Sequence, residues 1–197
     1  MMRPNRSLKE GIKLVKALRE RGEKVIVDLG CGFRKKGTVG IDITRNGTDA
    51  DLICQLGFET IPLPDNSVNR VVCQDFLEHL PKGYYSERER KLNYPIIDLF
   101  NEIWRILKPG GKFISRTPAE GHPEMHRDPT HLSVWNLQSM GYFCGEYRVS
   151  KIYGLKETFE LVENEMEGFY LRAVLRKPKP EKVVPVDSGP ATPPLAP

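Results

Sequence analysis

The stretch VIVDLGCGFRKKGTVGID, residues 25–42, constrains the fold more than any other part of the chain. An apolar segment ends in Asp28, a glycine turn reading GCG follows, and a second apolar segment ends in Asp42. Ligands of open α/β sheets bind beyond the carboxyl ends of the strands, which is where both acids stand. Only six residues, Phe33–Thr38, lie between Gly32 of this turn and Val39 at the start of the second segment, although a parallel crossover usually takes a dozen residues or more. Either the first crossover is reduced to a turn, or these strand limits are off by a few residues.

Strand-like and helix-like segments alternate along most of the chain. Apolar runs predict strands at residues 25–29, 39–43, 51–54, 68–73, 112–116, 147–153 and 169–176. Apolar residues at helical spacing predict helices at residues 7–21, 76–80, 95–107 and 136–143. Residues 159–162 fit either a further strand or a helix turn. This alternation predicts an α/β fold with a parallel sheet.

The length of 197 residues suits one folded domain with two flanking segments. Residues 1–24 carry eight Lys or Arg against three Glu and are expected to form a basic amphipathic helix, with Leu8, Ile12, Val15 and Leu18 on its buried face. Residues 25–176 are expected to form the main domain. Residues 177–197 hold seven prolines and no aromatic residue, so we expect a disordered tail.

Neither the apolar runs nor the cysteines indicate export or a membrane. No apolar run is long enough to span a bilayer, and the first ten residues lack the apolar core of a secretion signal. The four cysteines are widely spaced and none forms a CxxC pair. Buried thiols in a reducing compartment are therefore expected, and we expect a cytoplasmic protein without membrane insertion.

Several ligand classes fit the sequence poorly. The nicotinamide fingerprint GxGxxG needs a glycine where Lys35 stands, and no GK[ST] follows the turn as a phosphate-binding loop requires. The alternative for the glycine segment is a tight turn between a strand and a loop that binds no ligand. A later segment holds His122, His126 and His131, with Glu124 and Asp128. Their spacing, broken by two prolines, matches no tight ligand template, so we predict no metal site.

Further motifs follow in a fixed order: VIVDLGCG, GIDI, ADLICQL, FLEHL and EIWRILKPGGKFI. This set resembles the class I S-adenosylmethionine-dependent methyltransferases, and within them a compact subgroup with a short first crossover and a later loop reading DPTH. The resemblance covers roughly residues 25–143. It implies a Rossmann-like, mostly parallel sheet with shortened early crossovers and an antiparallel C-terminal hairpin, and S-adenosyl-L-methionine as the cofactor.

The same resemblance assigns cofactor contacts by motif. Asp42 would take the ribose hydroxyls, and the Gln55–Leu56 pair would contact the adenine, although relatives usually have Asp where Gln55 stands. A glycine common in the family is replaced by Arg34. The residues implied to bind the cofactor are Asp28, Gly30, Cys31, Gly32, Asp42, Gln55, Leu56 and Gln74.

The catalytic candidates are His131, His79 and Asp75. Methyl transfer from a sulfonium is an in-line displacement in which alignment supplies much of the acceleration, and a general base is needed only when the acceptor must lose a proton. His79 lies in FLEHL beside the expected site, and Asp75 falls where relatives contact the methionine or the substrate. His131, at the end of the DPTH loop, is expected to orient the acceptor or to act as its base. Glu78 is expected to be a helix-start or packing charge.

The methyl acceptor and the oligomeric state are left open by the sequence. The basic first helix slightly favours an anionic partner, and nucleic acid is one candidate without specific support. Enzymes that methylate exocyclic amines of DNA carry a PPY motif after the fourth strand, where this chain has CQDF. The sequence therefore does not favour methylation of such an amine. The alternative class is a non-catalytic methyltransferase-like binding module or subunit, which the departures at Gln55 and Arg34 permit. A nicotinamide enzyme comes third, since its glycine pattern fails.

Overall fold

The computed structural model describes residues 7–180, and these residues build a seven-stranded sheet. Its strand order is β3-β2-β1-β4-β7-β9-β8, and every pairing from β3 to β7 is parallel, whereas β9 runs antiparallel to both β7 and β8. The mostly parallel sheet with an antiparallel C-terminal hairpin confirms the expected fold class. The strands are β1 (Ile26–Leu29), β2 (Val39–Asp42), β3 (Leu52–Ile53), β4 (Val68–Gln74), β7 (Leu107–Pro118), β8 (Glu160–Glu167) and β9 (Tyr170–Arg176).

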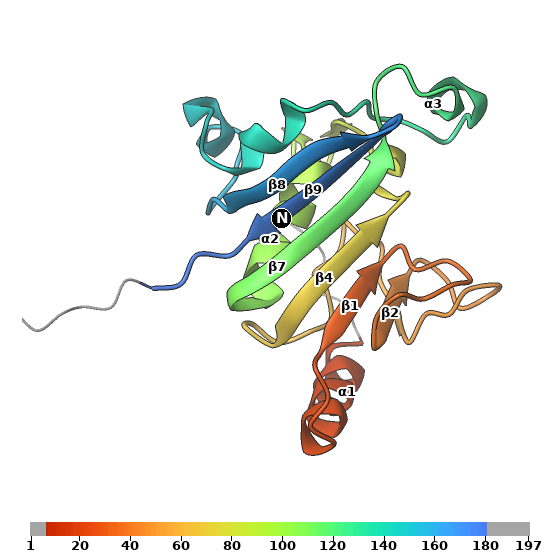
Figure 1. The fold of residues 1–197 in the computed structure, drawn as a ribbon, viewed down its shortest axis with the longest axis vertical. Coiled ribbons are helices and arrows are strands. Elements are labelled where there is room, and N and C mark those ends of the chain that lie inside the picture. The colour runs from red at the N-terminus through yellow and green to blue at the C-terminus, as the bar shows by residue number, and fades with distance from the viewer. Residues whose placement is uncertain (1–6, 181–197) are drawn as a thin grey trace, which may run out of the picture.

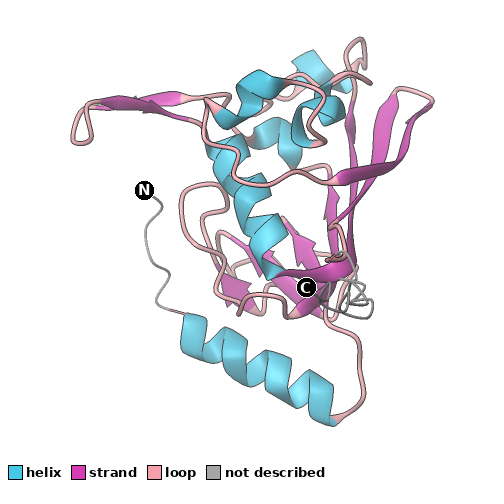
Figure 2. Cartoon of the chain, turned by 90° about the vertical axis from the view of Figure 1, so that its left-hand side faces the viewer, coloured by secondary structure: helices cyan, strands magenta, loops and turns pink. Residues whose placement is uncertain are grey.

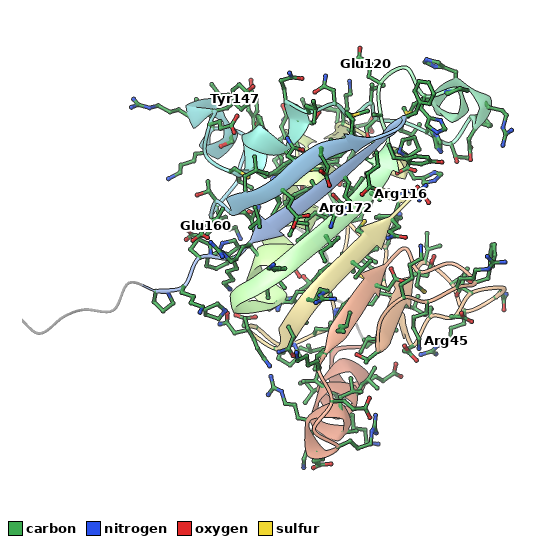
Figure 3. The ribbon with its side chains drawn as sticks, viewed as in Figure 1. Arg45, Arg116, Glu120, Tyr147, Glu160 and Arg172 are labelled. Atoms are coloured by element: carbon green, nitrogen blue, oxygen red, sulfur yellow. The ribbon has the colours of Figure 1, made fainter. Side chains whose placement is uncertain are left out.

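The early crossovers are turns, as the spacing between Asp28 and Asp42 suggested. No helix lies between β1 and β2, between β2 and β3, or between β3 and β4, all of which fall within the described residues. Thr38 holds the first crossover close to the sheet, because its Oγ1 accepts a hydrogen bond from Ile26 N at 2.9 Å. Helix α2 (Pro95–Ile106) lies behind the sheet in Figure 1. With no helix in the early crossovers, no described helix covers the near face over β4, β7 and β9. Arg116 and Arg172, which are register partners, lie on this open face (Figure 3).

The main core lies between the sheet and α2. Pro95 opens this helix at its first turn, where a missing N–H costs nothing, and the helix ends at Ile106. Phe100 is fully buried, stacks on Phe143 with ring centroids 3.5 Å apart, and meets Phe113 of β7 edge to face at 5.4 Å. These contacts join the helix, the sheet and the C-terminal third into one core.

Helix α1 (Leu8–Glu20) packs at one end of the sheet (Figure 1). Val15 and Leu18 are buried as expected, whereas Leu8 and Ile12 are 45% and 47% exposed. Gly11 explains the difference, because it lies so close to Pro62 that an added Cβ would stand 1.7 Å from the Pro62 carbonyl oxygen. The helix therefore contacts the rest of the chain through Gly11, Val15 and Leu18, and the predicted buried face was wrong at Leu8 and Ile12.

The polar segment between β4 and α2 forms a β-hairpin of β5 (Tyr84–Ser86) and β6 (Lys91–Asn93). It projects from the body of the protein as a two-stranded arm (Figure 2). Tyr84 at its base meets Phe58, with ring centroids 5.4 Å apart.

The last third of the chain departs most from the prediction. Residues 147–153 form no strand but the 3₁₀ turn η3 (Arg148–Lys151), which is closed by hydrogen bonds such as Ser150 N to Tyr147 O at 3.1 Å. Val149 is 47% exposed, so its apolar character did not mark a buried strand. The other short helices are η1 (Leu77–His79), α3 (Glu124–Arg127) and η2 (Ser139–Phe143).

Lys177, which we placed in the tail, belongs to the folded domain. Its ammonium group donates to Asn66 Oδ1, Trp104 O and Leu107 O at 2.7 to 2.9 Å and lies 3.7 Å from the centre of the Trp104 ring. The residue is only 3% exposed. The boundary expected at residue 177 is therefore too early, and the remainder of the tail from residue 181 onward lies outside the described residues.

All four cysteines are free thiols, and three of them are buried, as expected. Within residues 7–180, no helix combines the length and the apolar character needed to cross a bilayer.

Candidate cofactor and acceptor pockets

The candidate site lies at the edge of the sheet where β1, β2 and β4 end. The parallel register pairs Leu29 with Ile41 on one side and with Cys73 on the other, so the three strands end side by side. The glycine turn after β1, Asp42 at the end of β2, and the Gln74–Asp75 pair after β4 therefore share one edge. The sequence predicted this edge as the binding edge, and the structure brings these residues together there.

The glycine turn is attached to β2 by its main chain. Gly30 N donates to Ile41 O at 2.9 Å, and Gly32 N donates to Asp42 Oδ2 at 2.9 Å. Both glycines have positive φ, +67° and +51°, which side chains other than glycine rarely adopt. Gly30 also lies against Phe76, where an added Cβ would stand 2.4 Å from Cδ2, whereas a Cβ on Gly32 would meet no protein atom within 4 Å. The turn is thus tight at Gly30 and open at Gly32.

Asp42 is half-buried and borders a pocket of about 230 Å³. One carboxylate oxygen accepts from Gly32 N and the other accepts from Ile43 N at 2.7 Å, so the group is held in place while each oxygen retains a second lone pair. The pocket is lined by Asp42, Ile43, Cys54, Gln55, Leu56, Phe58, Phe76, His79, Leu80 and Pro81. It combines one carboxylate with mostly apolar walls.

Gln55 and Leu56, the expected adenine contacts, both lie on this pocket. Leu56 is buried at 4% exposure, and Gln55 is exposed. The main chain of Gln55 is fixed by a turn, because its N–H donates to Glu59 Oε2 at 3.1 Å and its carbonyl accepts from Phe58 N at 3.0 Å. These hydrogen bonds fix the main chain from which the side chains of Gln55 and Leu56 extend.

Asp28 is buried at 3% exposure and holds the loop that follows the glycine turn. Its Oδ2 accepts from Lys36 N at 2.6 Å, and the Lys36 side chain reaches Gln74 Oε1. Burial is the main cause that raises the pKa of Asp28, and the hydrogen bond from Lys36 opposes it. Cys31 is buried as well, and burial raises the pKa of its thiol to about 11, so the thiol is neutral near pH 7.

A second pocket of about 500 Å³ adjoins the first, and His79 lies on the wall of both. This second pocket is lined by Asp75, Glu78, His79, Pro118, Arg127, Asp128, Pro129, His131 and Tyr170. The three catalytic candidates, Asp75, His79 and His131, therefore border one pocket. The rings of His79 and His131 meet edge to face, with centroids 4.8 Å apart.

Asp75 is engaged in an ion pair. Its carboxylate accepts from Arg116 Nη1 at 2.8 and 3.2 Å, and the Arg116 guanidinium lies 3.6 Å from the centre of the Tyr170 ring. Its main chain has φ +51°, a conformation that Asp adopts more readily than most residues. Asp75 is thus positioned with Arg116 on the rim of the pocket.

Glu78 joins the FLEHL segment to the DPTH loop, a role that sequence reasoning missed. It is 1% exposed, its carboxylate accepts from Thr117 Oγ1 at 2.7 Å, and its carbonyl accepts from Leu132 N and Ser133 N at 2.7 and 3.0 Å. Its buried position in the first turn of η1 agrees with the expected helix-start or packing charge, whereas its hydrogen bonds to these distant residues were not predicted. Its place next to His79 in the sequence was the one available signal.

The DPTH loop determines which nitrogen of His79 carries the proton. Thr130 Oγ1 donates its hydrogen to Asp128 Oδ1 at 2.6 Å, and the same oxygen lies 2.9 Å from His79 Nδ1. Because the hydroxyl hydrogen is used toward Asp128, Nδ1 of His79 must be the donor in this contact. The hydrogen bonds from Thr130 hold the pKa of Asp128 below its usual range, so Asp128 stays an acceptor. In the tautomer that this contact favours, Nε2 is the ring nitrogen that carries the free lone pair.

The other histidines of the segment lie elsewhere. His122 is buried against the rings of Phe169 and Tyr170, and His126 is exposed on α3. Of the three histidines that the sequence grouped together, His131 alone borders the pocket of about 500 Å³.

A model of a known protein family matches just over half of the chain. Residues 15–115, which are 101 of the 197 residues, match the family described as "Methyltransferase domain". No match was found among the curated proteins.

Solved structures share the fold. One is the complex between the Haloferax volcanii Trm112 methyltransferase activator and the putative methyltransferase, with 18% identity, a TM-score of 0.50, and coverage of 87% of this chain and 96% of that chain. A second is a Pyrococcus horikoshii protein with 16% identity, a TM-score of 0.51, and coverage of 88% of this chain and 92% of that chain. A third is Haemonchus contortus phosphoethanolamine N-methyltransferase 2, which was solved with phosphomonomethylethanolamine and S-adenosylhomocysteine. It has 15% identity, a TM-score of 0.52, and coverage of 85% of this chain and 53% of that chain. The chain therefore belongs to the methyltransferase domain family, and its fold is that of the class I S-adenosylmethionine-dependent methyltransferases.

Proposed function

We propose that this chain is an enzyme that moves a methyl group from S-adenosyl-L-methionine to an acceptor held in the pocket of about 500 Å³. The observation that carries the proposal is the position of His79 on the walls of both pockets. Asp42 borders the smaller pocket and His131 the larger one, so two ligands held there would meet at His79. A transferase needs this arrangement of donor and acceptor.

The residues of the smaller pocket fit the nucleoside part of the cofactor. The Asp42 carboxylate has acceptor capacity left for the ribose hydroxyls, and Gln55 and Leu56 stand beside it for the adenine. The methionine part would lie along the open side of the glycine turn at Gly32, near Asp28, Gly30, Cys31 and Gln74. When bound, the cofactor supplies a methyl group on a positively charged sulfur that leaves readily.

The residues of the larger pocket would align the acceptor and take its proton where it has one to lose. His79 presents an unprotonated Nε2, and His131 stands beside it. Asp75 is the weaker candidate for a base because Arg116 already pairs with its carboxylate. Arg127 lies on the same pocket together with the carboxylates of Asp75, Glu78 and Asp128, so the lining does not select an acceptor by its charge. The four free thiols support the expected cytoplasmic location.

Transfer of labelled methyl groups tests the proposal. Wild-type protein would be incubated with methyl-labelled cofactor and separate small-molecule, RNA and protein extracts, with Asp42→Ala as the inactive control. We expect label in one class of acceptor with the wild type and none with Asp42→Ala. Once that acceptor is known, His131→Ala should lower turnover without changing cofactor affinity. Tight binding of the cofactor without transfer into any fraction would instead support the non-catalytic binding module.

A further inference from the structure

Three potential metal ligands converge in the larger pocket. Glu78 and His79 belong to the turn η1 after β4, and His131 ends the DPTH loop. One potential ligand atom from each side chain lies within 4.8 Å of the other two. All three residues line the pocket of about 500 Å³, so a ligand held there could also contact the acceptor space.

His131 has a ring nitrogen that lacks a partner. Its side chain is 7% exposed, and its Nδ1 is buried without a hydrogen bond to any described residue. Its other nitrogen, Nε2, lies 3.8 Å from Asp128 Oδ2. A buried polar atom left unpaired is destabilising, so its retention calls for a partner that residues 7–180 do not provide.

His79 is oriented as metal-binding histidines usually are. Its Nδ1–H donates to Thr130 Oγ1, which in turn donates to Asp128, and Nε2 is left with its lone pair. In metal sites, the nitrogen opposite the metal typically donates to an oxygen in this way, which fixes the tautomer and the direction of the ring. The Thr130–Asp128 pair supplies that support here.

Glu78 provides an anionic ligand in an interior position. It is 1% exposed, and the hydrogen bond from Thr117 Oγ1 orients its carboxylate. A carboxylate at this depth loses its contact with water, so an ionised Glu78 without a cationic partner is unfavourable here. A cation between Glu78 and the two imidazoles would compensate for that cost.

We infer that Glu78, His79 Nε2 and His131 Nδ1 bind one divalent transition-metal ion of the zinc type. Two imidazole nitrogens and one carboxylate form a donor set of catalytic zinc sites, which keep a position open for water or substrate. Mg²⁺ and Ca²⁺ prefer oxygen ligands alone and fit this set poorly. The set also differs from the one that sequence spacing led us to reject, because it uses only His131 from the histidine-rich segment.

The ion would act on the acceptor, and this consequence, unlike the binding itself, rests on the proposed methyl transfer. Because Glu78, His79 and His131 all line the larger pocket, the bound ion would be within reach of an acceptor there, and it would hold an oxygen of the acceptor and lower the pKa of that group. His79 and His131 would then act on the acceptor through the ion.

Metal binding can be measured without cofactor or acceptor, so failure of methyl transfer would leave this result intact. Chelator-treated full-length protein would be titrated with Zn²⁺ against a chromogenic chelator, and with Co²⁺ by its visible absorption. We expect one equivalent per chain, no competition from Mg²⁺, and loss of this site in His79→Ala and in His131→Ala. The matched control is His126→Ala, an exposed histidine of α3 outside the cluster, which should bind as the wild type does.

Thr130→Val covers the case in which a ligand variant fails to fold. Thr130 is exposed, so the protein should tolerate the change, while His79 loses its supporting acceptor. Removal of such an outer partner typically lowers metal affinity about 10- to 100-fold, and we expect a loss in that range. The inference is overturned if folded wild type shows no saturable site. It is equally overturned if Thr130→Val binds as the wild type does, or if His126→Ala loses as much affinity as His79→Ala.

Discussion

The two glycines of the turn after β1 should respond differently to alanine. Both have positive φ, so a left-handed alanine costs each of them about 1 to 2 kcal/mol. At Gly30 the new methyl group would also stand 2.4 Å from Cδ2 of Phe76, and such overpacking typically costs about 1 to 3 kcal/mol more. We therefore expect Gly30→Ala to lose about 2 to 5 kcal/mol of unfolding free energy and Gly32→Ala about 1 to 2 kcal/mol.

Thermal melts and cofactor titrations together test this reasoning. For a domain of this size, about 1 kcal/mol lowers Tm by about 2 to 4 °C, so Gly32→Ala should melt within about 8 °C of the wild type. Because no protein atom lies near the added methyl at Gly32, the space there is available to the cofactor, and Gly32→Ala should remain folded while binding S-adenosylhomocysteine much more weakly. Equal melting temperatures for the two variants, or wild-type affinity in Gly32→Ala, would refute the argument.

Two further predictions concern stability. Deleting residues 181–197 should leave Tm unchanged. Deleting residues 177–197 also removes the buried hydrogen bonds of Lys177, so it should lower the free energy of unfolding by at least about 1.5 to 3 kcal/mol and Tm by about 3 to 12 °C. Equal melting temperatures for the two deletions would contradict the buried position of Lys177. Asp28 has a pKa raised above 3.8 in the folded state, so its contribution to stability is greatest below pH 3.8 and falls as the pH rises through the folded-state pKa. Urea unfolding from pH 4 to 7 should therefore show Asp28→Asn gaining stability relative to the wild type as the pH rises, and a difference that does not change with pH would be the contrary result.

The sequence predicted well those features that depend on neighbouring residues. Short motifs predicted where strands β1 to β4 lie along the chain, the turn at Gly30 and Gly32, and the position of Asp42 at the end of β2. The same holds for α2, whose proline start and apolar face can be read directly along the chain. In these places local preference and the final fold agree.

Features that depend on distant residues could not be predicted in this way. Glu78 is buried because Thr117, 39 residues away, donates to its carboxylate, and no local pattern reports such a contact. Residues 147–153 have the apolar alternation of a strand, but the sheet already ends in β8, so these residues close a 3₁₀ turn instead. Lys177 follows the last strand in a proline-rich context and is nevertheless held by Trp104 and Leu107.

Cofactor binding in the smaller pocket can be measured by calorimetric titration with S-adenosylhomocysteine, which needs no knowledge of the acceptor. Asp42→Ala removes the carboxylate of the smaller pocket, and Asp49→Ala serves as its matched control, since Asp49 accepts from Lys35 N on the same side of the sheet without lining that pocket. We expect one site per chain in the wild type and in Asp49→Ala, and loss of binding in Asp42→Ala. Absence of binding to folded wild type, or equal binding by Asp42→Ala, would contradict it.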